Sequence, residues 1–394
     1  MIFFKKITNL FRLNINYEGR NFGLDLMRAI AIFVVLNNHS YMLEKAETNF
    51  PWIAFINGVD LFFVLSGFLI GTKLIKTLEK NASFGLKHLK EFWLNRWFRT
   101  LPNYYLILLV NVIFVYFGFI KENFSVFSWK YFLFLQNFYK PSVGFFWESW
   151  SLSIQEWFYI IFPILLAILS IILVKLKISK RYVFLIASIL IIIIPLLLKL
   201  FIASKFDIDS SFWIRERVFK VVVYRIDSLA VGLLAAYVKY WHPKIWHKYR
   251  NIALIVGIAI CYSIMYTSWA PANFSTKVFK TIFYSVGCVL LLPKFDSIKT
   301  APKTITKVVT HLSFISYAMY LINLALVCEL ICTQVNIETK QAAWFWYVAY
   351  WIITILVSTM IYKYYEKPMR DFLERWQKRR ALMKVLSPKI LPNF

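Results

Sequence analysis

Apolar runs of about 20 residues, bounded by charged residues, recur along this 394-residue chain. About 20 apolar residues form a helix that crosses the roughly 30 Å hydrocarbon core of a bilayer. The composition agrees, since 60% of the residues are hydrophobic, 17% are charged and the mean hydropathy is +0.60. Soluble domains are about 45–50% apolar and about 25% charged. The sequence therefore excludes a soluble globular enzyme, a disordered chain and a disulfide scaffold, and it predicts an all-α, polytopic membrane helix bundle.

The apolar runs predict ten spans, near residues 24–43, 53–75, 101–120, 152–174, 182–203, 218–238, 251–269, 278–293, 311–332 and 343–365. Alternate connections and the two terminal segments hold 32 Lys and Arg on one side and 12 on the other. The richer side is expected to be cytoplasmic, which places both termini inside a plasma (inner) membrane. We expect a cytoplasmic arm at 1–21, a transmembrane domain at 22–372 and a basic cytoplasmic tail at 373–394. The segment from Lys363 onward is predicted to be a helix on anionic lipid.

The net charge of +26 would suggest nucleic acid in a soluble protein. The excess of Lys and Arg in cytoplasmic loops explains it better here, so no nucleic-acid partner is expected. No spacing of His and Cys resembles a zinc site, and we predict no metal. The cysteines lie in apolar stretches and are interpreted as small packing residues: Cys261, Cys288, Cys328 and Cys332.

Charged residues inside apolar runs are costly to bury, so each is a candidate functional residue. Arg28 and His39 are eleven residues apart in the first span, within roughly 20° of three full turns, so they share one face of a helix. Asp60 in the second span is predicted at a depth similar to that of His39. Its carboxylate can there orient the imidazole, which makes His39 a candidate general base. A structural histidine bonded to a neighbouring carbonyl is the alternative.

Further polar residues lie in the later spans. Glu156 is near the outer end of the fourth span, and Asn323 lies twelve residues into the ninth. Arg225 and Asp227 share the sixth span, where they either neutralise one another or belong to the site.

Two arginines, Arg96 and Arg99, stand at the mouth of the third span. Guanidinium groups can bind pyrophosphate bidentately, which makes them candidates for binding a phosphorylated ligand together with Arg28. A role in membrane topology alone is the alternative for each.

The chain resembles acyltransferase family 3, the integral-membrane O-acyltransferases that modify bacterial surface polysaccharides, lipopolysaccharides, peptidoglycan and some secreted small molecules. The resemblance covers roughly residues 22–372. It rests on DLMRAIAIFVVLNNH with its R-x10-H spacing, GVDLFFVLSGFLIG, RWFRTLPNYY, WSLSIQEWFY, YRIDSLAVG, ISYAMYL and YEKPMRD, in the family's order. The R-x10-H spacing followed by GVDLFFVLSGFLI is its most specific part.

The resemblance implies an acyl-coenzyme A donor, usually acetyl-CoA, bound from the cytoplasm, with no permanently bound cofactor. The acyl group would pass to a hydroxyl at the outer face, with Arg28 and His39 as the family's essential pair. Asp60 would orient His39, while Glu156 or Asn323 would contact the acceptor. Direct transfer and a covalent acyl intermediate, on His39 or a hydroxyl such as Ser66, both stay open.

Two positions depart from the family's pattern. Asn323 stands where the pattern usually has histidine, and an amide cannot shuttle a proton. Gln155 replaces the first acid of the WSLxxEE stretch and leaves Glu156 alone. Because no hydrolase-like domain follows the last span, acceptor choice is expected to come from the membrane core, the outer loops or a separate envelope partner.

The sequence therefore predicts a membrane O-acetyltransferase whose acceptor is a saccharide or lipid-linked saccharide. The alternative is an exporter of polysaccharide or its intermediates, although no inverted repeat is visible and few helices are broken by Gly or Pro. A structural membrane scaffold is weaker still, because it leaves the costly intramembrane charges without a purpose.

Overall fold

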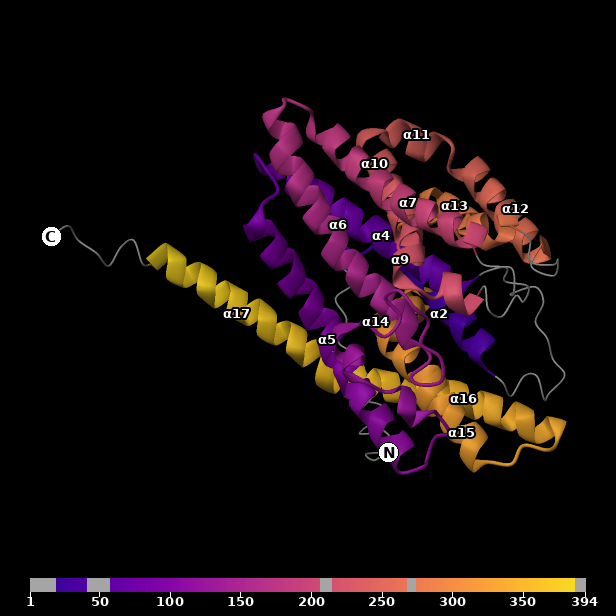
Figure 1. Ribbon diagram of the computed structural model, residues 1–394. Helices are drawn as coiled ribbons and strands as arrows, with labels where there is room; N and C mark the ends of the chain where they lie inside the picture. Colours follow the sequence, from indigo (N-terminus) through magenta and orange to yellow (C-terminus); the bar gives the residue numbers. More distant parts are fainter. Residues whose placement is uncertain (1–18, 41–56, 206–214, 268–273, 387–394) are drawn as a thin grey trace.

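The computed structural model describes residues 19–40, 57–205, 215–267 and 274–386, and every regular element in these ranges is helical (Figure 1). The predicted all-α bundle is thus confirmed. The elements are α2 (Phe22–His39), α4 (Gly58–Lys80), α5 (Leu86–Tyr116), η1 (Phe124–Val126), η2 (Trp129–Leu133), α6 (Ser149–Lys175), α7 (Lys180–Lys205), η3 (Arg215–Phe219), α9 (Val222–Arg225), α10 (Asp227–Trp241), α11 (Pro243–Lys248), α12 (Arg250–Thr267), α13 (Phe274–Ser297), α14 (Lys303–Ile322), η4 (Asn323–Cys328), α15 (Glu329–Gln334), α16 (Lys340–Ile361), η5 (Tyr362–Glu366) and α17 (Lys367–Leu386).

Seven helical segments within the described ranges are long and apolar enough to cross a membrane: Gly58–Lys80, Leu86–Tyr116, Ser149–Lys175, Lys180–Ile202, Val278–Ser297, Lys303–Gln334 and Lys340–Arg379. The other three predicted spans coincide with α2, α10 and α12. α2 has 18 residues that include two charges, α10 has 15 residues, and the apolar part of α12 is Arg250–Ile264. Residues 41–43, 53–56 and 268–269 of the predicted spans, like most of the predicted arm, lie outside the described residues. The count of ten and the orientation remain predictions.

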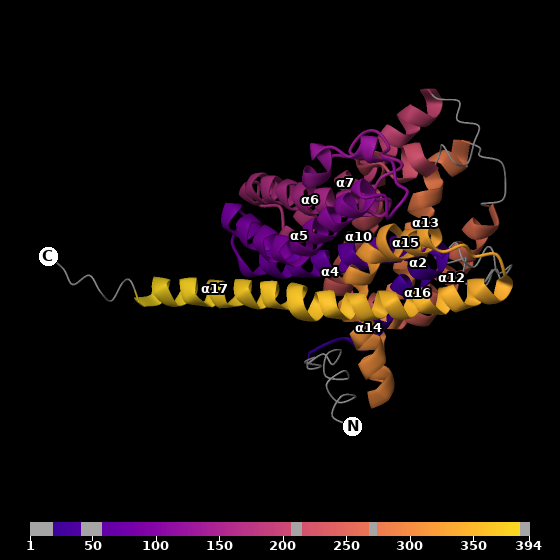
Figure 2. The same ribbon diagram turned by 90° about the horizontal axis from the view of Figure 1, so that it is seen from below.

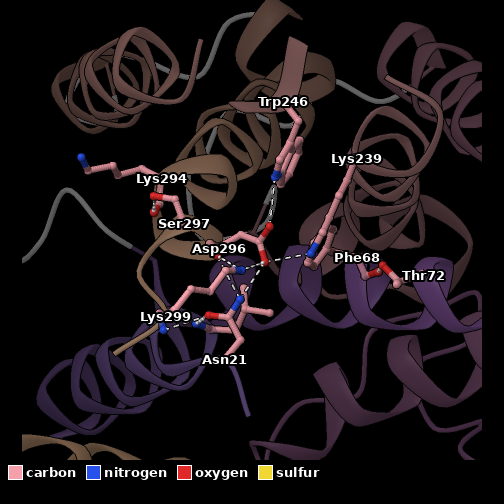
Figure 3. Close-up of polar contacts among 11 residues, drawn as sticks. Asn21, Phe68, Thr72, Lys239, Trp246, Lys294, Asp296, Ser297 and Lys299 are labelled. Atoms are coloured by element: carbon pink, nitrogen blue, oxygen red, sulfur yellow. Dashed lines mark hydrogen bonds and ion pairs between the residues drawn. The ribbon is translucent and has the colours of Figure 1, made fainter. Parts of the chain in front are cut away.

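An asparagine begins α2 and anchors it to the rest of the bundle. The Asn21 side-chain oxygen accepts backbone N–H groups of the first turn, as an N-cap does. Its Nδ2 donates to Asp296 Oδ1 at 2.8 Å, and the same buried carboxylate accepts Lys239 Nζ and Trp246 Nε1 (Figure 3). These contacts tie α2 to the ends of α10 and α13 and fix the axial position of Arg28.

α2 lies between the two hydrophobic cores of the bundle. Met27 and Ala31 pack into the core that α4, α6, α7, α10 and α13 share. One turn later, Val35 and Leu36 pack into the core of α5, α14, η4 and α16. Polar side chains of α2 are therefore held at the boundary between two packed halves.

Two glycines bring α4 and α10 into backbone contact. A Cβ added at Gly67 would lie 1.9 Å from the carbonyl oxygen of Leu229, and one at Gly232 would lie 2.3 Å from that of Val64. Close approach through small residues is a common way for membrane helices to associate. Any larger residue at these positions must push the two helices apart.

The connection from α5 to α6 folds back over the bundle. Tyr104 and Tyr105 of α5 donate their hydroxyls to the carbonyls of Tyr131 and Phe132, at 2.8 and 2.7 Å. Trp157 of α6 donates Nε1 to the Phe134 carbonyl at 2.9 Å. The connection therefore covers the ends of α5 and α6.

The last three elements form one uninterrupted helical rod. Lys340–Arg379 are 40 helical residues, and the α17 half projects beyond the rest of the bundle (Figure 2). The described part of the tail is helical, as an extension of α16 rather than a separate element, and its contact with anionic lipid stays a prediction.

Candidate functional site

The first polar cluster surrounds Arg28, nearly two turns after the start of α2. Arg28 Nη1 donates to Ser313 Oγ of α14 at 3.1 Å and lies 3.7 Å from Asp25 Oδ1. Ser313 Oγ donates to Asp25 at 2.8 Å, and Arg20 Nε donates to the other oxygen of the same carboxylate at 2.8 Å. Asp25 is thus shared by two arginines, which leaves Arg28 with unused donor capacity.

A cavity of about 310 Å³ begins at Arg28 and runs inward between α4, α5, α6 and α14. Its basic end is formed by Arg28, Arg96 and Arg99, and its other end reaches Ser151 and Tyr320. The remaining lining residues are mostly apolar: Val59, Phe62, Phe63, Leu65, Ser66, Leu69, Thr100, Leu152, Gln155, Tyr159, Ser316 and Tyr317. The three arginines predicted to act together do line one cavity.

Ser66 stands midway along this cavity in a chain of hydrogen bonds. Its Oγ lies 2.6 Å from the Tyr159 hydroxyl and accepts Gln155 Nε2 at 2.7 Å. The Tyr159 ring lies under the guanidinium of Arg96, 4.9 Å from its centroid. Gln155, at the position where the family pattern has an acid, therefore contacts a cavity hydroxyl.

His39 ends α2 and faces Asn323 of η4. His39 Nδ1 lies 2.7 Å from Asn323 Oδ1, while Asn323 Nδ2 donates to the carbonyls of Met319 and Tyr320 at 3.0 and 2.6 Å. Since the amide nitrogen is used by two carbonyls, its oxygen accepts, and Nδ1 of the imidazole carries the proton. The Nε2 lone pair is then available as a base.

Two contacts confirm the shared face predicted for α2. Arg28 meets Ser313 and His39 meets Asn323, so both side chains face the same helical segment, which runs parallel to α2. His39 itself does not line the cavity. It lies one turn beyond Tyr320, the lining residue whose carbonyl holds Asn323.

A carboxylate missed by the sequence reasoning supports η4. Glu148, 1% exposed, accepts the backbone N–H groups of Leu324 and Ala325 through Oε1, at 2.9 and 2.7 Å. Burial raises the pKa of Glu148 to about 8, against the opposing effect of these hydrogen bonds. Glu122, in the same connection, has its pKa raised by burial to about 7. The only hint of Glu148 in the sequence is its place, because it is an acidic residue two positions before the WSLSIQEWFY stretch.

Asp60 does not orient His39, contrary to prediction. Its Oδ1 accepts Arg225 Nη2 at 2.5 Å, and both residues are buried. Asp227 does not neutralise Arg225 either, because it accepts Lys199 Nζ of α7. Arg225 and Asp227, two residues apart, thus bind partners on different helices, and neither ion pair lines the cavity. These ion pairs join α4 to α9 and α7 to α10.

Glu156 is buried in α6 and is not among the residues that line the cavity. The prediction that it contacts the acceptor has no geometric support here. Asn323, the other predicted acceptor contact, is occupied by His39. Besides the first cavity, Arg99 also lines a second cavity, of about 290 Å³, together with Glu366 and Arg370. Both belong to the YEKPMRD stretch, whose positions the sequence reasoning left without a role.

Comparison with known proteins places these features in a family. A family described as an acyltransferase domain matches residues 21–363. A Staphylococcus aureus (strain COL) protein, provisionally named an O-acetyltransferase, is 29% identical over 380 residues, which cover 88% of this chain and 57% of the relative. The peptidoglycan O-acetyltransferase OatA of Listeria monocytogenes serovar 1/2a is 36% identical over 162 residues, covering 37% of this chain and 24% of the relative.

The chain thus spans little more than half the length of the Staphylococcus aureus relative. None of the solved structures matches it. The family match extends from the residue that caps α2 to the start of η5 and so includes both polar clusters and the cavity between them. On this ground the chain belongs to the family of acyltransferase domains.

Proposed function

We propose that this chain is a membrane O-acyltransferase that moves an acyl group, most simply acetyl, from acyl-coenzyme A to a hydroxyl of a surface or exported saccharide. The observation that carries the proposal is the cavity between the arginine cluster and the end of α2 where His39 stands. The donor enters at the basic end, which is the cytoplasmic side of the plasma membrane in this proposal, as the excess of Lys and Arg there favours.

The basic end and the apolar part of the cavity suit different parts of the donor. Arg28, Arg96 and Arg99 offer forked donors that suit the pyrophosphate of coenzyme A. Beyond them, a lining of Phe, Leu and Tyr with a few hydroxyls suits the thin pantetheine arm. The thioester is then delivered toward Tyr320, one turn from the base.

The chemistry follows from the tautomer that Asn323 imposes. His39 Nε2 takes the proton of the acceptor hydroxyl as its oxygen attacks the thioester carbonyl carbon. The carbon–sulfur bond breaks, the thiolate leaves, and the imidazolium returns the proton to that sulfur. The hydroxyl must lie within about 3.5 Å of the thioester carbon for this direct transfer. Transfer through an acyl-serine at Ser66 is the alternative route, since its hydroxyl lies in the cavity.

The acceptor is proposed from the names of relatives. One relative is named a peptidoglycan O-acetyltransferase, so a peptidoglycan saccharide is the first acceptor to test, followed by lipid-linked saccharides. A separate envelope protein that presents the acceptor, and membrane lipid around the apolar helices, are the proposed partners.

The test uses the full chain in lipid nanodiscs with [acetyl-¹⁴C]acetyl-CoA and soluble muropeptides, measuring free thiol and labelled saccharide. His39→Ala should insert normally and lose transfer by about 10²-fold or more. His311→Ala is the matched control, because His311 bonds Thr359 and does not line the cavity. Saccharide transport without thiol release would favour the exporter, and full transfer by His39→Ala would refute the proposed base.

A further inference from the structure

A third cavity, of about 420 Å³, opens at the basic end where α2 and α14 begin. Four cationic side chains and one carboxylate line it, with three threonines: Arg20, Asp25, Lys299, Lys303, Lys307, Thr300, Thr306 and Thr310. The excess of positive charge distinguishes it from the apolar cavity deeper in the bundle.

Three of these five charges are already engaged. Arg20 and Asp25 bind one another, and Lys299 donates to the Asp296 carbonyl beside Asn21 (Figure 3). Lys303 and Lys307 make neither an ion pair nor a hydrogen bond with any described residue. They are the two cations available to an incoming anion.

Both lysines are exposed, and their position favours a nearby anion. They stand four residues apart in the first turns of α14, where like charges repel one another across one helix face. The amino end of a helix also carries partial positive charge, which further disfavours cations and favours anions. A bound anion of two negative charges removes both penalties.

The third cavity continues the path of the proposed donor. It shares Arg20 and Asp25 with the cavity of about 290 Å³, which in turn shares Arg28 and Arg99 with the inner cavity. A ligand whose pyrophosphate lies at Arg28 and Arg99 therefore extends its outer end into this basic cavity. In coenzyme A, that outer end is a nucleoside with a phosphate monoester on its 3′ oxygen.

We infer that Lys303 and Lys307 form the binding subsite for the 3′-phosphate of the coenzyme A donor. The inference rests on the proposed function and extends it to the nucleotide end of the donor. A phosphate monoester carries about −1.5 to −2 charges at pH 7, which matches two lysines better than the single charge of a phosphodiester does.

The experiment measures the affinity of the purified full chain for coenzyme A and for 3′-dephospho-coenzyme A, by titration calorimetry in nanodiscs of zwitterionic lipid. The wild type should bind coenzyme A about fivefold or more tightly than the dephospho form. Lys303→Ala with Lys307→Ala should lose this preference, binding both ligands with the affinity that the wild type has for the dephospho form. Lys303→Arg with Lys307→Arg should retain it.

A matched control comes from Lys244 and Lys248, which are also four residues apart, exposed, and lie on α11 outside all three cavities. Their double Ala variant should keep the wild-type preference. A Lys303/Lys307 variant that keeps the preference, or that weakens both ligands equally, would refute the subsite while leaving the proposed function intact. Absence of coenzyme A binding by the wild type would instead refute the proposed donor.

A second arm distinguishes a lipid headgroup as the source of the phosphate. The same titrations are repeated with anionic lipid added to the nanodiscs. If the double Ala variant of Lys303 and Lys307 changes the effect of anionic lipid on ligand affinity but keeps the preference between the two ligands, the cavity binds lipid and the inference is wrong.

Discussion

Variants of the buried pair Asp60 and Arg225 can distinguish a structural role of Asp60 from a catalytic one. Asp60 is 2% exposed and Arg225 is 3% exposed, and Arg225 Nε has no hydrogen-bond partner among the described residues. Asp60→Ala would leave a buried guanidinium whose Nη1 keeps only Ser228 Oγ, at 2.6 Å. Removing one partner of a buried ion pair costs about 3–5 kcal/mol. We expect the lower half of that range, because Ser228 still accepts one hydrogen bond.

Replacing both partners should reverse most of this loss. Asp60→Leu with Arg225→Met fills a similar volume without burying a charge, and such exchanges are often neutral or stabilising by about 1–4 kcal/mol. The single variants should unfold at lower temperature than the wild type, by tryptophan fluorescence in detergent, and the double variant should recover. Transfer per folded molecule should be close to wild type in the double variant.

The neighbouring pair provides a control of the same kind. Lys199→Met with Asp227→Leu removes a buried ion pair that joins α7 to α10 and should behave alike. A double Asp60/Arg225 variant that is as stable as the wild type yet as inactive as His39→Ala would refute the structural assignment. That result would mean that Asp60 takes part in the reaction.

Other perturbations test the remaining geometry. Asn323→Leu leaves the Nδ1–H of the half-buried His39 without its acceptor, at a cost of up to about 1–3 kcal/mol. At constant folded protein, kcat should fall about tenfold or more. An unchanged kcat would show that Asn323 does not set the tautomer. Arg99→Gln should raise the KM for acetyl-CoA more than it lowers kcat, because the guanidinium meets the pyrophosphate in ground and transition states alike; an unaltered KM would make Arg99 a topology determinant only. The pKa of Glu148 is raised to about 8, so the folded state retains a proton that the unfolded chain loses above its ordinary pKa of about 4.5. Stability should therefore fall as pH rises from about 4.5 to 8, and Glu148→Gln should flatten this dependence in thermal melts at pH 5, 6, 7 and 8; an unchanged slope would contradict the assignment. Gly67→Ala forces a Cβ to within 1.9 Å of the Leu229 oxygen and should lower the melting temperature, whereas Gly85→Ala, which meets nothing within 4 Å, should not.

Helical periodicity made the arrangement of α2 predictable from sequence. The eleven-residue interval between Arg28 and His39 places them on one face, and the contacts to Ser313 and Asn323 follow that face. These are local properties of one helix.

Side-chain contacts between helices were harder to predict from the sequence. Depth within the membrane suggested Asp60 for His39, but many side chains share one depth, and rotation about the helix axis decides which of them meet. Asn323 holds His39 instead, and Asp60 meets Arg225, which is 165 residues away in sequence. Proximity in sequence misled in the same way for Arg225 and Asp227. Only the packing of α4, α7, α9 and α10 determines these choices.

The rod formed by α16, η5 and α17 has a mechanical consequence. Forty helical residues measure about 60 Å at 1.5 Å per residue, twice the roughly 30 Å of a bilayer's hydrocarbon core. At any tilt of less than about 60° from the bilayer normal, part of the rod must leave that layer, and the basic α17 is the part suited to headgroups. The helix continues from α16 through the π-helical turn η5 into α17 without an intervening loop. Glu366 and Arg370 stand on this rod and at the wall of the second cavity, so a change in the tilt of the rod within its bilayer would move that wall.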